Sequence, residues 1–493
     1  MRQPRPRDIH ALPRVALPRV RALAVAIVAC FGLAPPVAAD LEVLVPGGSR
    51  RLLARAGDTL NGGGTLRDKF DKVYWVPLPF GNVGWLFLSH EITAPLGGLS
   101  RLRYEDGEIT ERLSWVSGTH FNCSGVVTRW RTVLSCEEHP PADSLGLGNV
   151  LEVNPITPGL YWRRTALGRF SHEGIIEDPR TGDLYMTDDS YNGVFFRFVP
   201  AVPNNLSAGS LYALREATRD WVLVTDMVNT EQQAIDLGAT TRPRPEDLVY
   251  NPVDDAIYIA VTGVLSDPDS HLGYILRFNP RTREMTRWLD GDGTSLANPD
   301  NLEVDKHGNL YVHEDQYYEH VALYGNNELL LVRRDRTIEP ILRGLDPWGE
   351  VSGMEWSGSE QRFWINWMSG AAGSELFEIT CPPHWNIGVA PEPAPAPPML
   401  ALAIEPNPFA RAARLTADLT GLPRAPGERV RLEIYDVRGS LRRTLLDGPL
   451  PAHRLDVVWD GRDDHARPAP EGVYFARLAT AKQVIAEKVL RVR

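Results

Sequence analysis

Four short segments of the sequence repeat one arrangement, in which an acidic residue opens an apolar stretch. They are His172–Pro179, Pro245–Pro252, Pro299–Asp305 and Glu350–Gly353. Carboxylates that recur at one phase of a repeat can gather hard oxygen ligands, and calcium takes about six to eight of these. The candidate metal ligands in these segments are Glu173, Glu246, Asp247, Asp300 and Glu350.

A second group of candidates stands at the ends of apolar stretches. Val133–Glu138 ends in Cys-Glu-Glu, and Leu310–Asp315 ends in His-Glu-Asp. A thiolate suits iron or zinc better than calcium. Cys136 beside Glu137 therefore predicts a mixed site, with calcium on oxygen and a transition metal near the sulfur. Glu314 is a further candidate ligand.

A simpler interpretation of each single residue stays open. Acidic residues at turns are commonly solvated, and a buried free cysteine is commonly a small hydrophobe. Recurrence of the acid at one phase nevertheless favours a shared site, because unrelated turns would not repeat it. Carboxylates gathered in a small cavity raise one another's pKa and oppose folding, and cations relieve that repulsion.

Six apolar stretches with polar ends define the elements that must position these side chains. Their ends are spaced by about 50 residues, with one longer interval, and four-stranded propeller blades recur at this period. The stretches are Trp85–Glu91, Val133–Glu138, Leu184–Asp189, Ile257–Thr262, Leu310–Asp315 and Phe363–Asn366. The sequence therefore predicts an all-β protein with a six-bladed β-propeller, and a pair of β-sandwiches is the alternative.

The innermost hairpin of a blade brings the start of one strand close to the end of the next. We therefore expect the acids that open the four segments to converge at one mouth of the central channel. The residues expected nearby, at strand ends, are Glu91, Glu137, Asp188 and Glu314.

Composition excludes several classes of protein. The chain has 493 residues and a net charge of −11, whereas a nucleic-acid-binding chain would need a basic face. Gly and Pro are abundant, which favours turns between short strands over long helices. Four cysteines are too few for a disulfide scaffold. The composition is therefore that of an acidic, β-rich globular protein with more than one domain.

Residues 1–39 have the pattern of a secretory signal peptide. Six arginines and one acid precede an apolar stretch from Ala22 to Ala34, and small residues lead to Ala39. Cleavage after Ala39 predicts a secreted, periplasmic or cell-surface protein, and lipidation at Cys30 is the alternative. No other segment is long and apolar enough to predict a membrane span.

A Pro/Ala-rich stretch, residues 389–400, divides the rest of the chain. It predicts an extended linker between a propeller domain, 40–388, and a small domain, 401–493. Alternating apolar and polar residues with Gly and Asp turns predict a small Ig-like β-sandwich for the second domain. It resembles the Ig-like modules of flagellar hook-capping proteins and of type IX secretion sorting domains. This resemblance implies secretion machinery or a cell-surface partner.

Several motifs of the large domain resemble those of the PhoX family, calcium-dependent alkaline phosphatases on a six-bladed propeller. In chain order they are Ser89–Glu91, Asn122–Gly125, Thr132–Glu138, His172 with Glu173, Arg244–Asp247 and Glu350–Gly353. The resemblance implies a phosphatase that acts on a small-molecule phosphate ester, with iron and several calcium ions at the channel mouth. The ligands that it implies are Cys136, Glu137, Glu173, Glu246 and Glu350, with Asp247, Asp300 and Glu314 as looser candidates.

The positions toward the phosphate depart from the PhoX pattern more than the ligand positions do. Ser89 replaces the family's Asn, and Trp348 stands just before Glu350, where an arginine would be expected. Ser89 and Arg244 are the residues implied to support substrate binding. Metal binding is thus a firmer expectation than phosphatase activity.

Two other interpretations remain open. Pro299–Tyr311 is similar to the motif of calcium-dependent gluconolactonases and paraoxonase-like esterases, in which a central calcium polarises a lactone carbonyl. That similarity covers one blade. The third interpretation is a non-catalytic surface propeller whose calcium is structural.

Overall fold

The computed structural model describes most of the chain after residue 40. The described ranges are 41–78, 82–138, 146–347, 349–357, 361–368, 373–382, 401–418, 429–436, 440–449, 451, 454–480 and 484–492. The predicted signal peptide (1–39), the predicted linker (389–400) and Trp348 lie outside these ranges.

Within the described part of residues 41–380, antiparallel strands form six sheets of four or five strands, and in each sheet they run in order from the inner to the outer edge. The first sheet contains β3 (Phe70–Pro77), β4 (Val83–His90), β5 (Gly97–Glu105) and β6 (Glu108–Thr119). The second contains β7 (Asn122–Val127), β8 (Val133–Glu137), β9 (Val150–Val153) and β10 (Tyr161–Arg163). The third contains β11 (His172–Glu177), β12 (Leu184–Asp188), β14 (Phe196–Val202), β15 (Asn205–Arg215) and β16 (Asp220–Val224).

The remaining three sheets close the series, and two of them take their outermost strand from the start of the described chain. The fourth contains β18 (Pro245–Asn251), β19 (Ala256–Val261), β20 (Tyr274–Asn279) and β21 (Glu284–Asp290). The fifth contains β22 (Pro299–Val304), β23 (Leu310–Glu314), β24 (Glu328–Val332), β25 (Ile338–Gly344) and β1 (Leu41–Val43). The sixth contains β26 (Glu350–Trp356), β27 (Arg362–Met368), β28 (Glu375–Thr380) and β2 (Ser49–Arg55).

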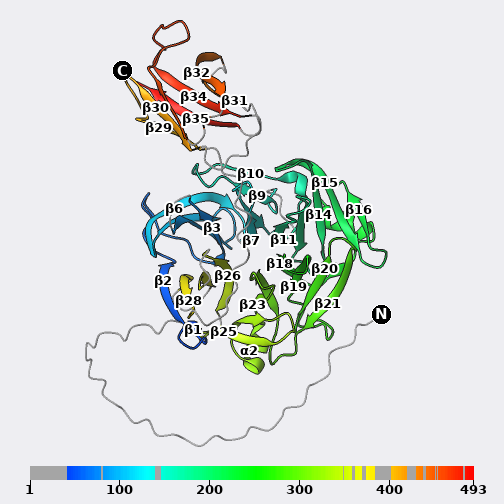
Figure 1. Cartoon of the computed structure of the whole chain (residues 1–493). Coiled ribbons are helices and arrows are strands. Elements are labelled where there is room, and N and C mark those ends of the chain that lie inside the picture. Colours follow the sequence, from blue (N-terminus) through cyan, green and yellow to red (C-terminus); the bar gives the residue numbers. More distant parts are fainter. Residues whose placement is uncertain are drawn as a thin grey trace, which may run out of the picture. The chain divides into compact units, whose positions relative to one another are not determined.

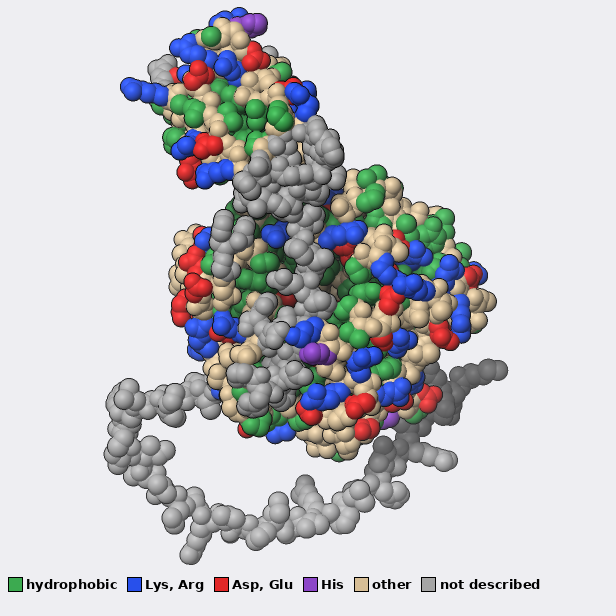
Figure 2. Space-filling view, viewed as in Figure 1, with side chains coloured by type: hydrophobic (Ala, Val, Ile, Leu, Met, Phe, Trp, Pro, Cys, Tyr) green, Lys and Arg blue, Asp and Glu red, His purple; other side chains and the backbone are tan. Residues whose placement is uncertain are grey.

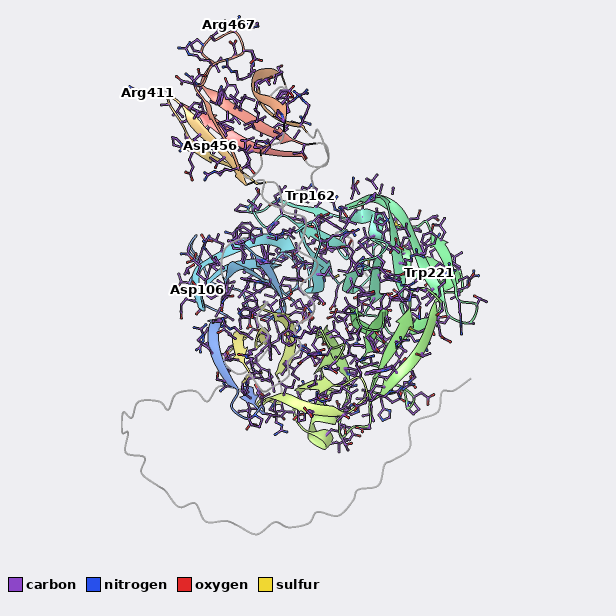
Figure 3. All side chains as sticks on the ribbon, in the orientation of Figure 1. Asp106, Trp162, Trp221, Arg411, Asp456 and Arg467 are labelled. Atoms are coloured by element: carbon purple, nitrogen blue, oxygen red, sulfur yellow. The ribbon has the colours of Figure 1, made fainter. Side chains whose placement is uncertain are left out.

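The sheets are arranged in a closed, propeller-like ring. The first strand of each sheet contacts the first strand of the next, in the order β3, β7, β11, β18, β22, β26 and back to β3. Figure 1 shows these strands around the centre and β6, β16, β21 and β2 at the periphery. Trp221 of β16 accordingly lies at the outer edge (Figure 3). The ring brings six strand starts from distant parts of the chain together.

The hydrophobic core lies between neighbouring sheets. One cluster joins Ile176 and Tyr185 of the third sheet to Ile257 and Phe278 of the fourth. Similar clusters join the fourth sheet to the fifth and the sixth to the first. Each sheet therefore buries apolar side chains on both faces, which favours near-continuous apolar strands over strict alternation. Lys, Arg, Asp and Glu side chains alternate over the outer surface of the ring seen in Figure 2.

The six strands predicted from apolar stretches are present, each as the second strand of a sheet. Where the predicted end is acidic, each strand ends one residue earlier: β4 at His90, β8 at Glu137, β12 at Asp188 and β23 at Glu314. Long helices are absent from the described residues, as the sequence predicts. The short elements are η1 (Thr165–Leu167), α1 (Thr230–Asp236), α2 (Tyr318–Tyr324) and the strand pair β13 (Gly193–Val194) and β17 (Thr241–Arg242).

The described residues after 400 form two further antiparallel sheets. One contains β29 (Ala401–Glu405), β30 (Ala413–Asp418) and β33 (Arg454–Trp459). The other contains β32 (Leu441–Pro449), β31 (Arg429–Asp436), β34 (Gly472–Ala479) and β35 (Val484–Arg491), in that order. Their common core is built around Trp459, Phe409 and Tyr474 and includes no residue before Leu402. Asp456 of β33 accepts a hydrogen bond from Nε of Arg414 of β30 at 2.7 Å (both sheets are seen in Figure 3).

A helix that crosses a membrane must be both long and apolar. None of the helices in the described part of the chain has both properties.

Candidate metal centre

A β-bulge near the start of the inner strand recurs in five of the six sheets. Phe70 pairs with His90 and Val73 with Leu88, so that two residues of β3 stand opposite one residue of β4. The same two-against-one arrangement recurs in β7, β11, β18 and β22. Bulges re-aim side chains and are common beside functional sites. The first residues of the five bulges are Asp71, Cys123, Glu173, Glu246 and Asp300.

The sixth sheet has a smaller irregularity, at Gly353 of β26. Gly353 has φ 30°, and a Cβ there would lie 2.2 Å from the carbonyl oxygen of Asp71 on the neighbouring inner strand. Only glycine therefore lets the last inner strand approach the first. Glu350, at the start of β26, supplies the acid of this sheet.

A backbone hydrogen bond that also recurs fixes the start of each of these bulged strands. The backbone N–H of the residue that follows the second strand donates to the carbonyl oxygen of the residue that precedes the inner strand. The donor and acceptor pairs are Glu91 with Lys69, Glu138 with Phe121, Asp189 with Ser171, Thr262 with Arg244 and Asp315 with Asn298, at 2.9–3.1 Å. These contacts hold the residues after the second strands beside the bulges.

Four of the residues that accept these bonds have left-handed backbone conformations. Their φ angles are 55° at Lys69, 33° at Phe121, 55° at Arg244 and 47° at Asn298. Positive φ is uncommon for residues other than glycine, and it is costly for a bulky residue such as Phe121. A left-handed residue thus precedes four of the five bulged strands.

Bulge residues and strand-end residues together form one connected cluster, which we call the carboxylate ring. It consists of Asp71, Glu91, Cys123, Glu138, Glu173, Asp189, Glu246, Asp300, Asp315 and Glu350. These residues fall into five overlapping groups of three, and in each group the ligand atoms lie within 4.8 Å of one another. Glu173, for example, belongs to a group with Asp71 and Cys123 and to another with Glu246 and Asp300.

The ring is electrostatically unfavourable as it stands. Burial, with repulsion from neighbouring carboxylates, raises the pKa of Glu91 to about 8 and that of Glu138 to about 7. The same causes raise the pKa of Asp300 to about 8 and hold that of Glu173 well above its ordinary value. Nine carboxylates and a thiol in one cluster therefore require protons or cations.

One arginine partly compensates the ring. Arg244 donates to Asp189 through Nε at 3.0 Å and through a terminal nitrogen at 3.2 Å, and it lies 2.6 Å from Glu246. Although burial opposes its charge, Glu246 and Asp189 keep the pKa of Arg244 above its ordinary value. Its guanidinium is therefore a fixed cation at the edge of the ring.

A second buried cluster, which we call the lysine cluster, lies slightly further along the inner strands. Lys72 Nζ lies 3.2 Å from Glu303 and 3.6 Å from Asp247, and Glu355 interacts with both Lys72 and Glu303. Although burial opposes its charge, Glu303 and Asp247 hold the pKa of Lys72 above its ordinary value. This cluster contains its own cation.

The structure brings four predicted ligands into the carboxylate ring and leaves four outside it. The four inside are Glu173, Glu246, Asp300 and Glu350. Asp247 belongs to the lysine cluster and accepts a hydrogen bond from the N–H of Leu248 at 2.9 Å. Cys136, opposite the bulge of β7, packs with Leu134 and Val150 in the hydrophobic core.

The other two predicted ligands are engaged by nearby donors. Glu137 pairs with Arg163 and accepts the N–H groups of His120 and Asn149 at 3.3 Å. Glu314 accepts the N–H of Ala297 at 2.7 Å, with further bonds from Gln316 Nε2 and the N–H of Glu328. Both carboxylates therefore hold loops in place.

Ser89, predicted to support substrate binding, lies fully buried opposite the bulge of β3. Its hydroxyl accepts the N–H of Lys72 at 2.8 Å and donates to the carbonyl of the same residue at 3.3 Å. Thr187 Oγ1 accepts the N–H of Gly174 at 3.0 Å in the equivalent position of β12. These hydroxyls stabilise the bulges, whereas Arg244, the other predicted supporting residue, reaches the ring.

Six ring residues were not predicted as metal ligands, although Glu91 was expected near the channel mouth. They are Asp71, Glu91, Cys123, Glu138, Asp189 and Asp315. Two signals could have found them. Phe70-Asp71-Lys72 and Asn122-Cys123-Ser124 align with His172-Glu173-Gly174, at the phase of the other bulges. The strand-end acids lie one residue later than the predicted ones, because β8, β12 and β23 end before them.

A pocket of about 630 Å³ opens beside the ring. Glu138, Asp189 and Arg244 line its ring side. Its other walls include Arg169 and the apolar side chains of Phe121, Phe170, Tyr191 and Val228. A ligand could thus contact the ring and an apolar wall together.

The donor set fits hard cations together with a softer metal. Asp71 is 5 % exposed, and its Oδ2 has no hydrogen-bond partner among the described residues. Carboxylate oxygens suit calcium, and the Cys123 sulfur suits iron or zinc. Cys123 Sγ lies 2.9 Å from Glu138 Oε1. The ring therefore has the composition of a centre that binds several cations of two kinds.

A propeller-like fold with a buried cluster of carboxylates and a thiol fits the class of metal-dependent propeller proteins. Comparison with known proteins narrows this class. The chain matches the family described as alkaline phosphatase PhoX over residues 88–369, more than half of its length. A search of curated proteins found no significant match. The chain belongs to the PhoX alkaline phosphatase family.

Several solved structures are similar to this chain, and the first of them shares its fold. Pseudomonas fluorescens PhoX, in complex with the transition-state analogue vanadate, is 17% identical; the match covers 69% of this chain and 96% of that one, with a TM-score of 0.57. A gluconolactonase from Xanthomonas campestris is 17% identical over 71% of this chain and 98% of that one (TM-score 0.38). PorZ of Porphyromonas gingivalis, a surface component of its type IX secretion system, is 12% identical over 89% and 54%, respectively (TM-score 0.37). The first match shows a shared propeller-like fold.

Proposed function

We propose that this protein is a metal-dependent phosphatase that hydrolyses phosphate esters at the carboxylate ring of a six-bladed β-propeller. The observation that carries the proposal is the recurring bulge, which aims one acid or thiol from each of five inner strands into one cluster. Membership of the PhoX family supports phosphate esters as the substrate class.

Calcium and iron are the proposed cofactors. Glu173, Glu246, Asp300 and Glu350 would hold calcium through carboxylate oxygens, and Cys123 would hold iron through its sulfur. Bound cations would neutralise charge on the phosphate and promote attack by an oxygen nucleophile. Cys136, the thiol favoured by the sequence, is the alternative iron ligand. Its packing against Leu134 in the core favours Cys123 instead.

Arg244 is the residue proposed to bind and orient the phosphate. Nε and one terminal nitrogen of Arg244 are held by Asp189, and the other terminal nitrogen would donate to a phosphate oxygen. Asp189 and Glu246 hold this guanidinium at the pocket edge, so that little freedom is lost when substrate binds. Ser89 would act indirectly, by stabilising the bulge that carries Asp71. Glu137, Asp247 and Glu314 would also act as positioning residues.

The proposed organisation of the chain follows its sequence. Residues 1–39 would direct export and be removed near Ala39, which places the protein in the periplasm, outside the cell or on its surface. Residues 389–400 would link the propeller to an Ig-like β-sandwich at 401–493. The sandwich would mediate secretion or surface attachment, as its resemblance to the modules of hook-capping proteins and type IX secretion sorting domains implies.

The decisive experiment measures metals and activity on the same purified mature chain. We expect calcium and iron, and hydrolysis of a phosphomonoester that a chelator abolishes. Phosphodiester and lactone substrates are assayed in parallel. Lactone turnover without phosphate-ester turnover would favour a lactonase instead, and metals without any turnover would favour a structural role.

A pair of cysteine variants tests the ligand assignment. Cys123→Ser should lose iron and activity, whereas Cys136→Ser should retain both, because only Cys123 shares a cluster with ring carboxylates. Iron retained by Cys123→Ser and lost by Cys136→Ser would reverse the assignment.

A further inference from the structure

We propose that the pocket beside the ring selects phosphate monoesters whose alcohol carries an aromatic or similarly bulky apolar group. The inference rests on the proposed phosphatase function and specifies its substrate class. In the reaction, water breaks the ester P–O bond, the alcohol leaves with a proton, and inorganic phosphate remains. The pocket would hold the alcohol.

The size of the pocket indicates more than a phosphate. Its volume of about 630 Å³ lies within the usual range for sites that enclose a whole organic ligand. A phosphate bound at Arg244 and the ring would occupy the ring side alone. The space between Phe121 and Val228 would then face the rest of the ester.

The pocket also concentrates exposed apolar side chains. Tyr191 is 74% exposed and Val228 is 60% exposed, and both line the pocket. They come from separate connections, Tyr191 after β12 and Val228 before α1. Single exposed apolar residues are ordinary, but these two line the same pocket. An apolar ligand group would remove both from water.

The rest of the apolar wall is held in place. The ring of Phe170 stacks on His172 at 3.5 Å and on Phe196 at 4.4 Å, so its position is fixed by packing. Phe121 has a strained backbone, with φ 33°, and its carbonyl is tied to the N–H of Glu138. The wall and the charged end of the pocket are therefore fixed relative to each other, which favours one orientation of the ester.

The test compares benzyl phosphate with ethyl phosphate, because both release a primary alcohol. With the metal-loaded full mature chain, we expect kcat/KM for benzyl phosphate to exceed that for ethyl phosphate by about tenfold. Tyr191→Ser and Val228→Ser should each bring this ratio toward one, because kcat/KM should fall more for benzyl phosphate than for ethyl phosphate. Val202→Ser is the matched control, since Val202 is 57% exposed and lies outside the pocket.

Equal turnover of the two esters by the unaltered chain, or an unchanged ratio in both pocket variants, would overturn the inference. Hydrolysis of neither ester would refute the proposed function, and binding then decides the inference. Calorimetry with benzylphosphonate and ethylphosphonate should show tighter binding of the benzyl compound, lost in Tyr191→Ser. Equal binding of the two phosphonates would refute the selectivity.

Discussion

The carboxylate ring and the lysine cluster are built on the same inner strands, but they differ in how far nearby cations compensate their buried acids. Asp71 and Glu246 belong to the ring, whereas the next residues, Lys72 and Asp247, belong to the lysine cluster. A bulge has placed consecutive side chains in different clusters. In the lysine cluster the ammonium of Lys72 lies among three buried acids. In the ring nine carboxylates share the cation of Arg244, which pairs directly with Asp189 and Glu246.

This difference distinguishes structural acids from functional ones. A buried carboxylate with a cation or several N–H donors is compensated, and removing its partner mainly costs stability. Carboxylates with raised pKa values and little compensation lower stability unless a ligand binds them. Burial also raises the pKa of Glu314 to about 8, so it is the hydrogen-bond donors and cations around Glu137, Glu314 and Asp247 that favour a structural role. The carboxylate ring is the proposed functional centre.

Removing the metals should produce the largest effect, and it should affect the ring alone. In the metal-free protein the pKa of Glu91 is raised to about 8 from an ordinary 4.5, so the folded state binds more protons than the unfolded state between these values. The free energy of unfolding should therefore fall as pH rises from 4.5 to about 8. Activity should be lost completely in chelator.

Thermal unfolding across this pH interval checks the sign. With calcium and iron restored, the fall in stability should shrink or reverse, because metal binding requires ionised carboxylates. A metal-free protein whose stability rises toward alkaline pH would contradict the assignment of the ring as an uncompensated cluster.

Replacing Lys72 should convert the lysine cluster into a second uncompensated one. Lys72→Met leaves Asp247, Glu303 and Glu355 buried without their ammonium. We expect a loss of about 3–5 kcal/mol in the free energy of unfolding at neutral pH, measured by urea denaturation. Lys72→Arg is the control, because it keeps the charge, and it should lose less. A Lys72→Met loss equal to that of Lys72→Arg would show that packing, not charge, matters in this cluster.

The sequence was sufficient to predict the position of the acids within each repeated segment, but not the directions in which their side chains point. Glu173, Glu246 and Asp300 open apolar stretches at one position of a repeat, and the structure brings them together. Asp247 directly follows Glu246, and a bulge sends its side chain elsewhere. Bulges depend on pairing between strands, which a periodic pattern does not reveal.

Strand ends account for the other differences. The predicted Glu137 and the ring residue Glu138 are identical in type, so composition cannot separate them. Their roles depend on the last paired residue of β8 and on Arg163, which follows 26 residues later in the sequence. Cys123 was missed for a related reason, because its segment has a thiol where the other segments have an acid.

The guanidinium of Arg244, at the edge of the carboxylate ring, allows a test of whether positive charge alone is enough for activity. Arg244→Lys keeps the charge but loses the paired donors that Asp189 holds. We expect kcat/KM for a phosphomonoester to fall about 100-fold with metal content unchanged. Arg197→Lys is the control, because Arg197 makes a comparable pair with Asp183 on the third sheet. Equal losses in both variants would indicate a general effect on folding.

The smallest effects on activity and stability are expected from variants of two adjacent acids, Glu138 and Glu137. Glu138→Gln removes a ring carboxylate and should lower activity by at least about tenfold. It should also stabilise the metal-free protein at alkaline pH, because burial and neighbouring carboxylates raise the pKa of Glu138 to about 7. The variant is assayed for bound metal, activity and thermal stability.

Glu137→Gln should have the opposite profile, since Glu137 is compensated by Arg163 and by two backbone N–H groups. It should lose about 1–3 kcal/mol of stability at any metal concentration and keep its metals and most of its activity. If Glu137→Gln lost the metals while Glu138→Gln kept them, the one-residue distinction between the ring and its supports would be wrong. Glu137 would then be a metal ligand, as the sequence predicts. This pair of variants therefore tests directly which of the two acids at the end of β8 belongs to the metal centre.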